Sequence, residues 1–381
     1  MILFLSNADT ELLALRTVLE DLPDGFFEVR AANPCRLGAP PIDGARAVIV
    51  RLLGGRRAWE DGFDALVARC RAAGVPLLAF GGEAVPDAEL TAASTVPSAT
   101  VVQAAAYLVQ GGPANLGQLL RFVADTVCME GFGFDPPTVV PDHGVFEERR
   151  AGAGRALVGV VFYRAHLVSG NTRFVTELCD GIEAAGADVV AVYCYSLRAE
   201  RPEVVRLLAE RGVDVVVTTV LAAGTSGVDD ETSWDAGALA ALGVPVVQAI
   251  SATSASAEWA AGTRGISPVD VAMCVAIPEF DGRIVSVPFS FKEEVDDELG
   301  VPVTAYRTVP DRVARIAGLA VRLAQLRRTP PAERRIALVL SAYPTKRSRL
   351  GNAVGLDTPA SVVELLSAMT RAGYRVDRVP D

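Results

Sequence analysis

Short apolar runs alternate with amphipathic stretches along most of the chain. Runs of about four to eight apolar residues have the length of buried strands, and apolar positions three and four residues apart are typical of helices that cover a sheet. In the first block the predicted strands are 2–5, 28–31, 47–50 and 76–80, and the predicted helices are 10–21, 58–73 and 116–128. This order predicts a parallel sheet of strand–helix–strand units, so residues 1–130 are expected to form an amino-terminal α/β domain.

The same alternation continues after a segment rich in proline and glycine at 131–155, which we interpret as a connector. In the second block the predicted strands are 156–163, 188–195, 214–219 and 244–249, and the predicted helices are 172–185, 202–211, 234–242 and 310–326. Residues 277–292 have a less regular pattern. We predict a second doubly wound α/β domain over 156–329.

A third block begins at 330 and is short. It contains the predicted strand 336–340, a helix at 359–372 and a strand at 374–379. Because sheets of fewer than three strands are marginally stable, either this block docks onto the second domain or it is the start of a truncated domain, and we favour the second interpretation. The expected fold class is α/β, with successive doubly wound (Rossmann-like) parallel-sheet blocks of which the last is incomplete.

Composition and charge exclude several classes of function. The net charge of -10, without a basic stripe, argues against a nucleic-acid-binding protein. No apolar run reaches the roughly 18–20 residues that a membrane span needs, and the start of the chain lacks a basic leader, so we expect a cytoplasmic protein. The six cysteines are scattered without a CxxC pair, which favours buried, reduced thiols.

The segment 343–361 carries the strongest candidate site. The predicted strand 336–340 is followed by three cations, Lys346, Arg347 and Arg349, and by two glycines, Gly351 and Gly355. Asp357 or Thr358 can cap the next helix. Open α/β sheets bind ligands at the carboxyl ends of their strands, and cations with free amides near a helix start bind anions. We favour a carboxylate- or phosphate-bearing ligand here over the alternative, a solvated and salt-bridged surface.

His166 is the second candidate, because it directly follows the predicted strand 156–163 and precedes a helix start. A functional imidazole is plausible there, and a structural hydrogen-bonding role is the alternative. The pair Gly170–Asn171 follows it, and a similar Gly–Asn pair at 351–352 indicates a weak internal repeat. His143, in the connector, is expected at the surface.

Glu279 and Asp281 are the third candidate. If the segment 278–282 is extended, alternation sends both carboxylates to the same side, where they can hold a hard cation or accept protons. The alternative is a hairpin turn with solvated acids. The acidic run 293–298 is expected to be a solvated face.

A nucleotide site is not expected in this chain. Neither a G-x-x-x-x-G-K-[ST] loop nor a G-x-G-x-x-G motif after a strand occurs. The pairs Gly54–Gly55 and Gly81–Gly82 follow strands without the remaining motif residues, so we interpret them as tight turns. Any nucleotide chemistry then belongs to a partner.

Four segments together resemble the CobN family, the large subunits of the aerobic, ATP-dependent cobaltochelatases of cobalamin biosynthesis. They are 163–172, with Tyr-Arg-Ala-His and Gly-Asn-Thr, 278–282 (Pro-Glu-Phe-Asp-Gly), 288–292 (Pro-Phe-Ser-Phe-Lys) and 343–361. The run Gly-Asn-Ala-Val-Gly-Leu-Asp-Thr-Pro-Ala-Ser is long and unusual, which makes the resemblance specific, and it extends along the whole chain. The large subunit of magnesium chelatase is similar more distantly.

This resemblance implies an amino-terminal portion of a longer protein. It implies binding of the corrinoid hydrogenobyrinic acid a,c-diamide and of Co²⁺ as the substrate metal. ATP would be hydrolysed by partner subunits, namely an AAA+ ATPase and a second accessory subunit. Activity of the short chain alone stays open. The alternatives are a non-catalytic tetrapyrrole- or metal-binding fragment and a magnesium-chelatase-like porphyrin-binding subunit.

The resemblance also implies residue roles, because metal insertion removes pyrrolic protons and strips a hydrated cation. Glu279 or His166 is expected to act as the base, and both are expected to ligate the metal transiently. Four residues are expected to bind the substrate and its peripheral carboxylates: Lys346, Arg349, Asn352 and Asn171. The family carries His where this chain has Arg347, which leaves a metal role at that position open.

Overall fold

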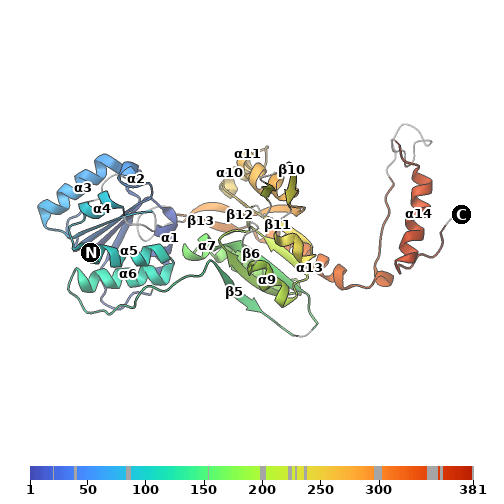
Figure 1. Cartoon of the computed structure of the whole chain (residues 1–381), viewed down its shortest axis with the longest axis horizontal. Helices are drawn as coiled ribbons and strands as arrows, with labels where there is room; N and C mark the ends of the chain where they lie inside the picture. The colour runs from blue at the N-terminus through green and yellow to red at the C-terminus, as the bar shows by residue number, and fades with distance from the viewer. Residues whose placement is uncertain are drawn as a thin grey trace.

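The structure is a computed structural model. It describes residues 1–19, 21–37, 41–82, 87–152, 154–197, 203–221, 225–227, 230–235, 238–295, 303–340, 351 and 355–379. Two α/β domains lie side by side, and a carboxy-terminal helix stands apart from both (Figure 1). The predicted α/β fold class is confirmed.

The amino-terminal domain is built on a four-stranded parallel sheet. Its strands, in sheet order, are β2 (Val29–Ala32), β1 (Ile2–Ser6), β3 (Ala47–Leu52) and β4 (Leu77–Gly81). Its longer helices are α1 (Asp9–Leu19), α3 (Glu60–Ala73), α5 (Ser98–Gln110) and α6 (Pro113–Thr126). Figure 1 shows α3 on one side of the sheet and α5 and α6 on the other. Because helices cover both faces, the strands are almost continuously apolar, which is why their positions could be predicted.

Some elements of this domain are not predicted from the sequence. They are α5 and the short helices α2 (Pro34–Leu37), α4 (Ala88–Ala93) and η1 (Arg56–Trp59). The sequence of α5 is rich in alanine and valine, and its polar positions are few, so it lacks a clear helical pattern of polar residues. The predicted tight turn at Gly54–Gly55 is confirmed, since both residues have positive φ.

The second domain contains a seven-stranded sheet. Its strands, in sheet order, are β13 (Val303–Thr308), β12 (Ile284–Val295), β11 (Val246–Ala252), β8 (Val215–Thr218), β6 (Leu157–Tyr163), β7 (Asp188–Cys194) and β5 (His143–Arg149). The five central strands are parallel, and the two edge strands pair antiparallel with their neighbours.

Two separate cores cover the faces of this sheet. Along β6, Val158, Val160 and Phe162 pack with α8 (Arg173–Ala184) and α13 (Pro310–Arg328) on one face. Leu157 and Val161 point to the other face, where α9 (Glu203–Arg211) and the 3₁₀ helix η2 (Ala238–Leu242) pack. This alternation is the period of two that a strand imposes.

Three predictions for this domain are wrong in detail. The connector 131–155 contains the edge strand β5, whose mixed burial hides its pattern in the sequence, and His143 is partly buried in it opposite Cys194. Within the predicted helix 234–242, Trp234 belongs to β10 (Asp230–Asp235), which pairs with β9 (Thr225–Gly227), and among the described residues of this range only those of η2 are helical.

The irregular segment 277–292 contains most of the long strand β12. Pro288 interrupts its pattern at a shift in the pairing with β11, a position where a strand tolerates proline. Glu293, predicted in a solvated acidic run, instead accepts a hydrogen bond from the Ser256 backbone N–H at 2.7 Å. That donor begins the helix α10 (Ser256–Ala261).

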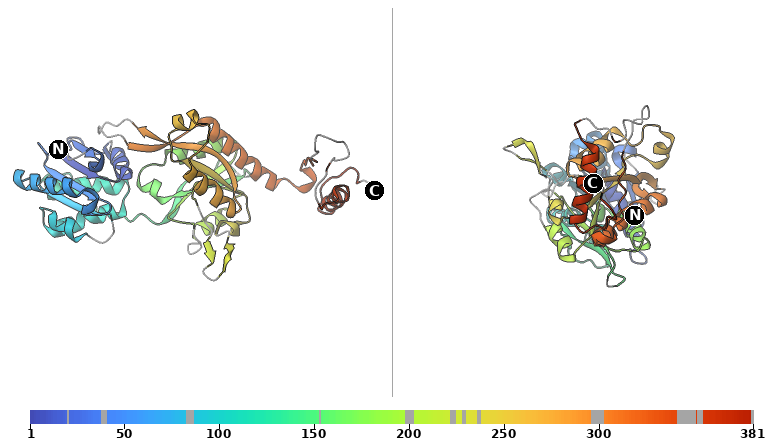
Figure 2. Two further views of the ribbon diagram at one scale, coloured as in Figure 1. Left: turned by 90° about the horizontal axis from the view of Figure 1, so that it is seen from above. Right: turned by 90° about the vertical axis from the view of Figure 1, so that its right-hand side faces the viewer.

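Of the elements predicted for the third block, the helix is present and the two strands are not. Helix α14 (Thr358–Arg371) begins as predicted, because the Asp357 side chain accepts a hydrogen bond from the Ala360 backbone N–H at 3.1 Å. Residues 336–340 and 374–379 form no strand, and none of the residues in α14 is buried. The left view in Figure 2 agrees with Figure 1 that the described part of this block stands apart from the second domain. The described residues of this block therefore do not support the interpretation that it docks onto the second domain.

Two smaller expectations are also tested. All six cysteines are free thiols, and every one except Cys35 is buried, so the prediction of reduced cysteines is confirmed. In the part of the chain that the structure describes, no helix combines the length and the apolar character that a bilayer crossing requires.

Candidate functional site

The carboxyl ends of the central strands of the second domain carry a group of polar side chains. The chain passes from β6 to β7 on one side, and β8 then adds on the other side of β6. Open α/β sheets bind ligands at such a change of direction. The Tyr163 hydroxyl, at the end of β6, accepts a hydrogen bond from the Leu221 backbone N–H, which follows β8, at 3.1 Å. The two strand ends are thus held together where a ligand site is expected.

His166 lies close to these strand ends on the short helix α7 (Arg164–Val168), directly after β6. Its ring centroid is 5.0 Å from that of Phe174 and 5.5 Å from that of Tyr306. Burial, together with the positive charge of Lys292, lowers the pKa of His166 to about 4. The imidazole is therefore neutral at neutral pH, and its lone pair is available to a metal ion without the loss of a proton.

Two further groups in these surroundings stay protonated at neutral pH. Burial, with Cys274 and Asp270 nearby, raises the pKa of Tyr306 to about 12. Burial, followed by the charge of Asp270, raises the pKa of Cys274 to about 11. Cys274 belongs to η3 (Ala272–Ala276), a single π-helical turn of a kind that is frequent at functional sites. These groups supply neutral hydrogen-bond donors and no thiolate.

Asp270 is a buried carboxylate that is not predicted from the sequence. It belongs to the helix α11 (Pro268–Val271), which Ser267 caps by accepting a hydrogen bond from the Asp270 backbone N–H at 3.1 Å. Its Oδ2 accepts hydrogen bonds from the backbone N–H and the hydroxyl of Thr253, both at 3.1 Å. The run Ser-Pro-Val-Asp is a signal from which the start of this helix could be predicted, since Ser, Pro and an acid at this spacing are typical of capped helices.

The segment 278–282 is helical, so the prediction that it is extended is wrong. It forms α12 (Ile277–Phe280) and a following turn. Glu279 is exposed, whereas Asp281 is buried and forms an ion pair with Arg283 at 2.7 Å. Because residues i and i+2 of a helix do not face the same way, the two carboxylates do not form the paired site that an extended segment would give.

Arg283 is a buried cation near the same strand ends. It is not predicted from the sequence either. Its guanidinium donates to the Val220 carbonyl at 2.6 Å and to the Gln248 side chain at 2.7 Å, besides the ion pair with Asp281. Its Nε–H has no partner in the described part of the chain. A buried donor without a hydrogen bond costs about 1–3 kcal/mol, so an acceptor oxygen that approaches this group would be stabilised.

Asn171 joins the loop after α7 to the edge strand β13. Its side chain is buried, and Oδ1 accepts a hydrogen bond from the Tyr306 backbone N–H at 3.1 Å. Because the Tyr306 ring lies edge-on to the His166 ring, Asn171 supports one wall of the surroundings of His166. Its amide oxygen is therefore used within the fold.

The remaining predicted substrate-binding residues belong to the cationic loop in the segment 343–361. Four residues of the cationic loop lie outside the described residues, namely Lys346, Arg347, Arg349 and Asn352. The substrate-binding roles expected of Lys346, Arg349 and Asn352 therefore stay predictions.

The two predicted metal ligands do not share one cluster. Among the described residues no group of three or more His, Cys, Asp and Glu side chains is suited to hold a metal ion. His166 is partly buried against Tyr306, and Glu279 is exposed on α12. Neither residue completes a coordination shell from its own surroundings, so ligation by either requires further donors.

Comparison with known proteins assigns this chain to a family. A family model described as CobN/Magnesium Chelatase matches residues 105–381. The chain belongs to this family. The curated relatives include the aerobic cobaltochelatase subunits CobN of Pseudomonas aeruginosa, 33% identical, and of Sinorhizobium sp., 34% identical. Each match covers 100% of this chain and 32% of the relative.

The solved structures include a family member of similar shape, the catalytic subunit of cobaltochelatase from Mycobacterium tuberculosis. It is 46% identical, with a TM-score of 0.84, and the match covers 100% of this chain and 31% of that one. The magnesium-chelatase subunit ChlH of Oryza sativa is 27% identical over 72% of this chain and 22% of its own length. This member of the CobN/magnesium chelatase family thus spans about a third of the length of the cobaltochelatase relatives.

Proposed function

We propose that this chain is a portion of a cobaltochelatase large subunit that takes part in the insertion of Co²⁺ into a corrin precursor. Family membership supports metal insertion into a tetrapyrrole as the general reaction. The cobalt branch is favoured because the similarity to the CobN subunits extends over 100% of the chain, against 72% for the magnesium-chelatase subunit. The proposed ring substrate is hydrogenobyrinic acid a,c-diamide, in cobalamin biosynthesis.

The observation that carries this proposal is a neutral imidazole at the change of direction of the sheet. His166 has a pKa of about 4 because burial and Lys292 disfavour its charged form. A group with so low a pKa is a weak base at neutral pH, but a competent metal ligand. We therefore assign His166 to transient ligation of Co²⁺ while the ion loses its hydration shell, in preference to proton removal.

Glu279 is the better candidate for the base. Its carboxylate is exposed on α12 and is accessible to a ring that approaches this face from outside. Removal of pyrrolic protons needs an acceptor within hydrogen-bond reach of the ring nitrogens. Two apolar side chains nearby in the sequence, Met273 and Phe280, are exposed as well and suit contact with a macrocycle.

The other predicted residues keep proposed roles. Lys346 and Arg349 would pair with the peripheral carboxylates of the corrinoid, and Asn352 would add an amide donor beside them. Asn171 would act through Tyr306, whose backbone N–H it holds. ATP would be hydrolysed by partner subunits, an AAA+ ATPase and a second accessory subunit, so that no nucleotide binds to this chain.

A spectral titration tests the proposal. The 381-residue chain is titrated with hydrogenobyrinic acid a,c-diamide, and cobalt insertion is then followed after addition of Co²⁺, ATP and the partner subunits. We expect binding, and we expect His166→Ala to bind the ring with nearly unchanged affinity but to slow insertion at least tenfold. The matched control is His143→Ala, on the far edge strand β5. Equal insertion rates for the two variants would remove His166 from the mechanism.

The same experiment separates the alternative functions. Ring binding without insertion under any combination of partners would select the non-catalytic binding fragment. Tighter binding of a porphyrin than of the corrinoid would select a subunit that resembles magnesium chelatase. The alternative that insertion needs only other parts of a longer chain predicts no effect of Glu279→Gln on ring binding or insertion.

A further inference from the structure

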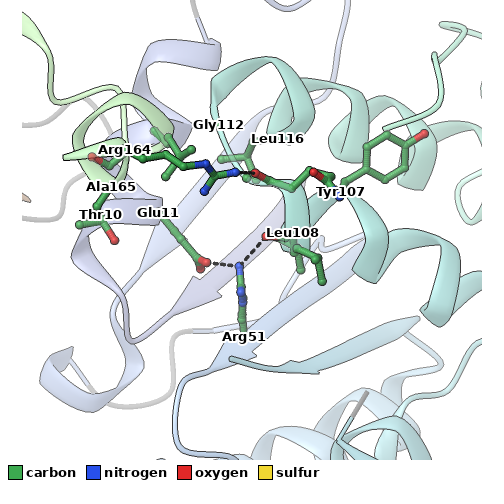
Figure 3. A pocket seen from close by; sticks show the side chains of 15 residues that line it. Thr10, Glu11, Arg51, Tyr107, Leu108, Gly112, Leu116, Arg164 and Ala165 are labelled. Atoms are coloured by element: carbon green, nitrogen blue, oxygen red, sulfur yellow. Dashed lines mark hydrogen bonds and ion pairs between the residues drawn. The ribbon is translucent and has the colours of Figure 1, made fainter. Parts of the chain in front are cut away.

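A cavity of about 220 Å³ lies between the two domains, and His166 is not among its lining residues. Figure 3 shows it between α1, the carboxyl end of β3, the turn after α5 and the helix α7 of the second domain. In the amino-terminal sheet, β1 pairs with β2 on one side and with β3 on the other, so the chain changes direction between β1 and β3. The cavity therefore occupies the place where open α/β sheets bind small ligands.

The charges around the cavity do not cancel. Glu11 and Arg51 form an ion pair, and each has further partners, since Glu11 accepts from the Ser6 hydroxyl at 2.7 Å and Arg51 donates to the Leu108 carbonyl at 3.2 Å. This pair is internally neutralised.

Arg164, on the opposite wall, supplies a cation without a counter-charge. Its guanidinium donates to the carbonyls of Val140 at 2.8 Å and Pro141 at 2.9 Å, and it forms no ion pair in the described part of the chain. Carbonyl dipoles satisfy hydrogen bonds, but they leave the formal charge uncompensated. A net positive charge therefore lies at this wall.

The rest of the lining is largely apolar. Ala14 of α1, Leu116 of α6 and Val168 of α7 face the cavity. A ligand that is anionic at one end and apolar over a few carbon atoms matches both the charge and the walls, because the carboxylate would meet Arg164 while the chain would bury apolar surface.

We propose that this cavity binds a carboxylate with a short apolar chain, and that its occupancy is transmitted to His166 through α7. The carboxylate belongs either to a free short-chain acid or to a side chain of the macrocycle, and the second source rests on the proposed function. The single turn of α7 carries both sites: Arg164 and Val168 line the cavity, whereas His166 contacts Phe174 in the core of the second domain.

Close packing makes α7 sensitive to the cavity. Gly170, which ends the α7 turn with φ at +67°, approaches α1 so closely that a Cβ there would lie 3.1 Å from the Thr17 hydroxyl oxygen. A Cβ on Gly111 would lie 3.6 Å from Val168. Because the Val168 side chain of α7 and the turn at Gly170 pack closely against the amino-terminal domain, a ligand that shifts the cavity wall also moves the residues next to His166.

The experiment uses the whole chain labelled with ¹³C-histidine and titrated with sodium butyrate at constant ionic strength. The chain has only two histidines, His143 and His166, so their signals are easily told apart. We expect a saturable shift of the His166 signals. Arg164→Met is expected to weaken binding about tenfold or more, since charge-assisted hydrogen bonds are lost.

Two further variants keep the test decisive. Arg327→Met is the matched control, because Arg327 also donates to a backbone carbonyl, that of Gly243, and lies away from the cavity. Ala165→Leu narrows the cavity without removing a charge and is expected to abolish butyrate binding, which decides the matter if Arg164→Met fails to fold. Unchanged butyrate affinity in folded Arg164→Met or in Ala165→Leu would overturn the proposal.

A second arm identifies the source of the carboxylate. Hydrogenobyrinic acid a,c-diamide replaces butyrate in the same titration. A response to the macrocycle alone that is lost in Arg164→Met assigns the site to a macrocycle side chain, and a response to butyrate stands even if the macrocycle does not bind at all. No saturable, Arg164-dependent response to either probe would refute the site.

Discussion

Replacement of Lys292 by methionine is expected to raise the pKa of His166 while leaving it below its ordinary value of 6.5. The pKa is lowered to about 4 by burial first and by the charge of Lys292 second. Lys292 is exposed, so water screens its charge, and we expect its removal to raise the pKa by less than about one unit. Burial against Phe174 and Tyr306 persists in the variant and accounts for the remaining depression.

The pKa also sets a pH dependence of stability. Folding favours the neutral form of His166, so its contribution is fully present above pH 6.5 and is lost as the pH falls towards 4. A shift of 2.5 units, from 6.5 to 4, corresponds to about 3 kcal/mol at about 1.4 kcal/mol per unit. Because the ring is only partly buried, we expect about 2 kcal/mol. When the pH falls from 7 to 4.5, the free energy of unfolding should decrease by about 2 kcal/mol more in the native chain than in His166→Gln.

The assay is the ¹³C chemical shift of the histidine side chains as a function of pH, with the signals assigned in His143→Gln. Urea denaturation of the native chain and of His166→Gln at the same pH values gives the stability difference. A wild-type His166 that titrates near pH 6.5 would show that the ring is hydrated. A Lys292→Met variant that titrates there would show that charge, and not burial, is the main cause.

Two further predictions concern buried groups of the same domain. Asp281→Asn leaves the buried Arg283 charge without its ion-pair partner and is expected to cost about 3–5 kcal/mol in urea denaturation, against less than about 0.5 kcal/mol for the exposed Glu279→Gln; similar costs for the two would contradict the buried ion pair. In the native protein a thiol reagent at pH 8 should modify Cys35 and spare Cys274, whose pKa is raised to about 11, and mass spectrometry of peptides would expose the reverse order.

Apart from β12, the sequence located the parallel strands of both domains within a few residues, because strands covered on both faces are continuously apolar. It missed β5 because an edge strand has one solvated face, and it missed most of β12 because Pro288 interrupts the pattern. It placed His166 correctly, directly after β6, since the end of an apolar strand can be located from the local pattern. Asp270 and Arg283 escaped notice because a single buried charge in a short segment looks like any surface charge.

The third block shows the difference between local and non-local determination. Helix α14 forms because its hydrogen bonds and its Asp357 cap lie within a few residues of one another. Residues 336–340 are as apolar as any strand of the chain, yet they stay exposed and unpaired, because a strand needs hydrogen-bond partners on neighbouring strands.

The amino-acid sequence by itself determined the α/β class, the order of the central strands and helices along the chain, the position of His166 after a strand and the family resemblance. Only the tertiary structure decided the neutral state of His166, since the ring of Tyr306 and the charge of Lys292 come from strands far along the chain. The same holds for the pairing of Asp281 with Arg283 and for the cavity beside Arg164. Burial and charge depend on distances in space, and these are set when the sheet brings its strand ends together.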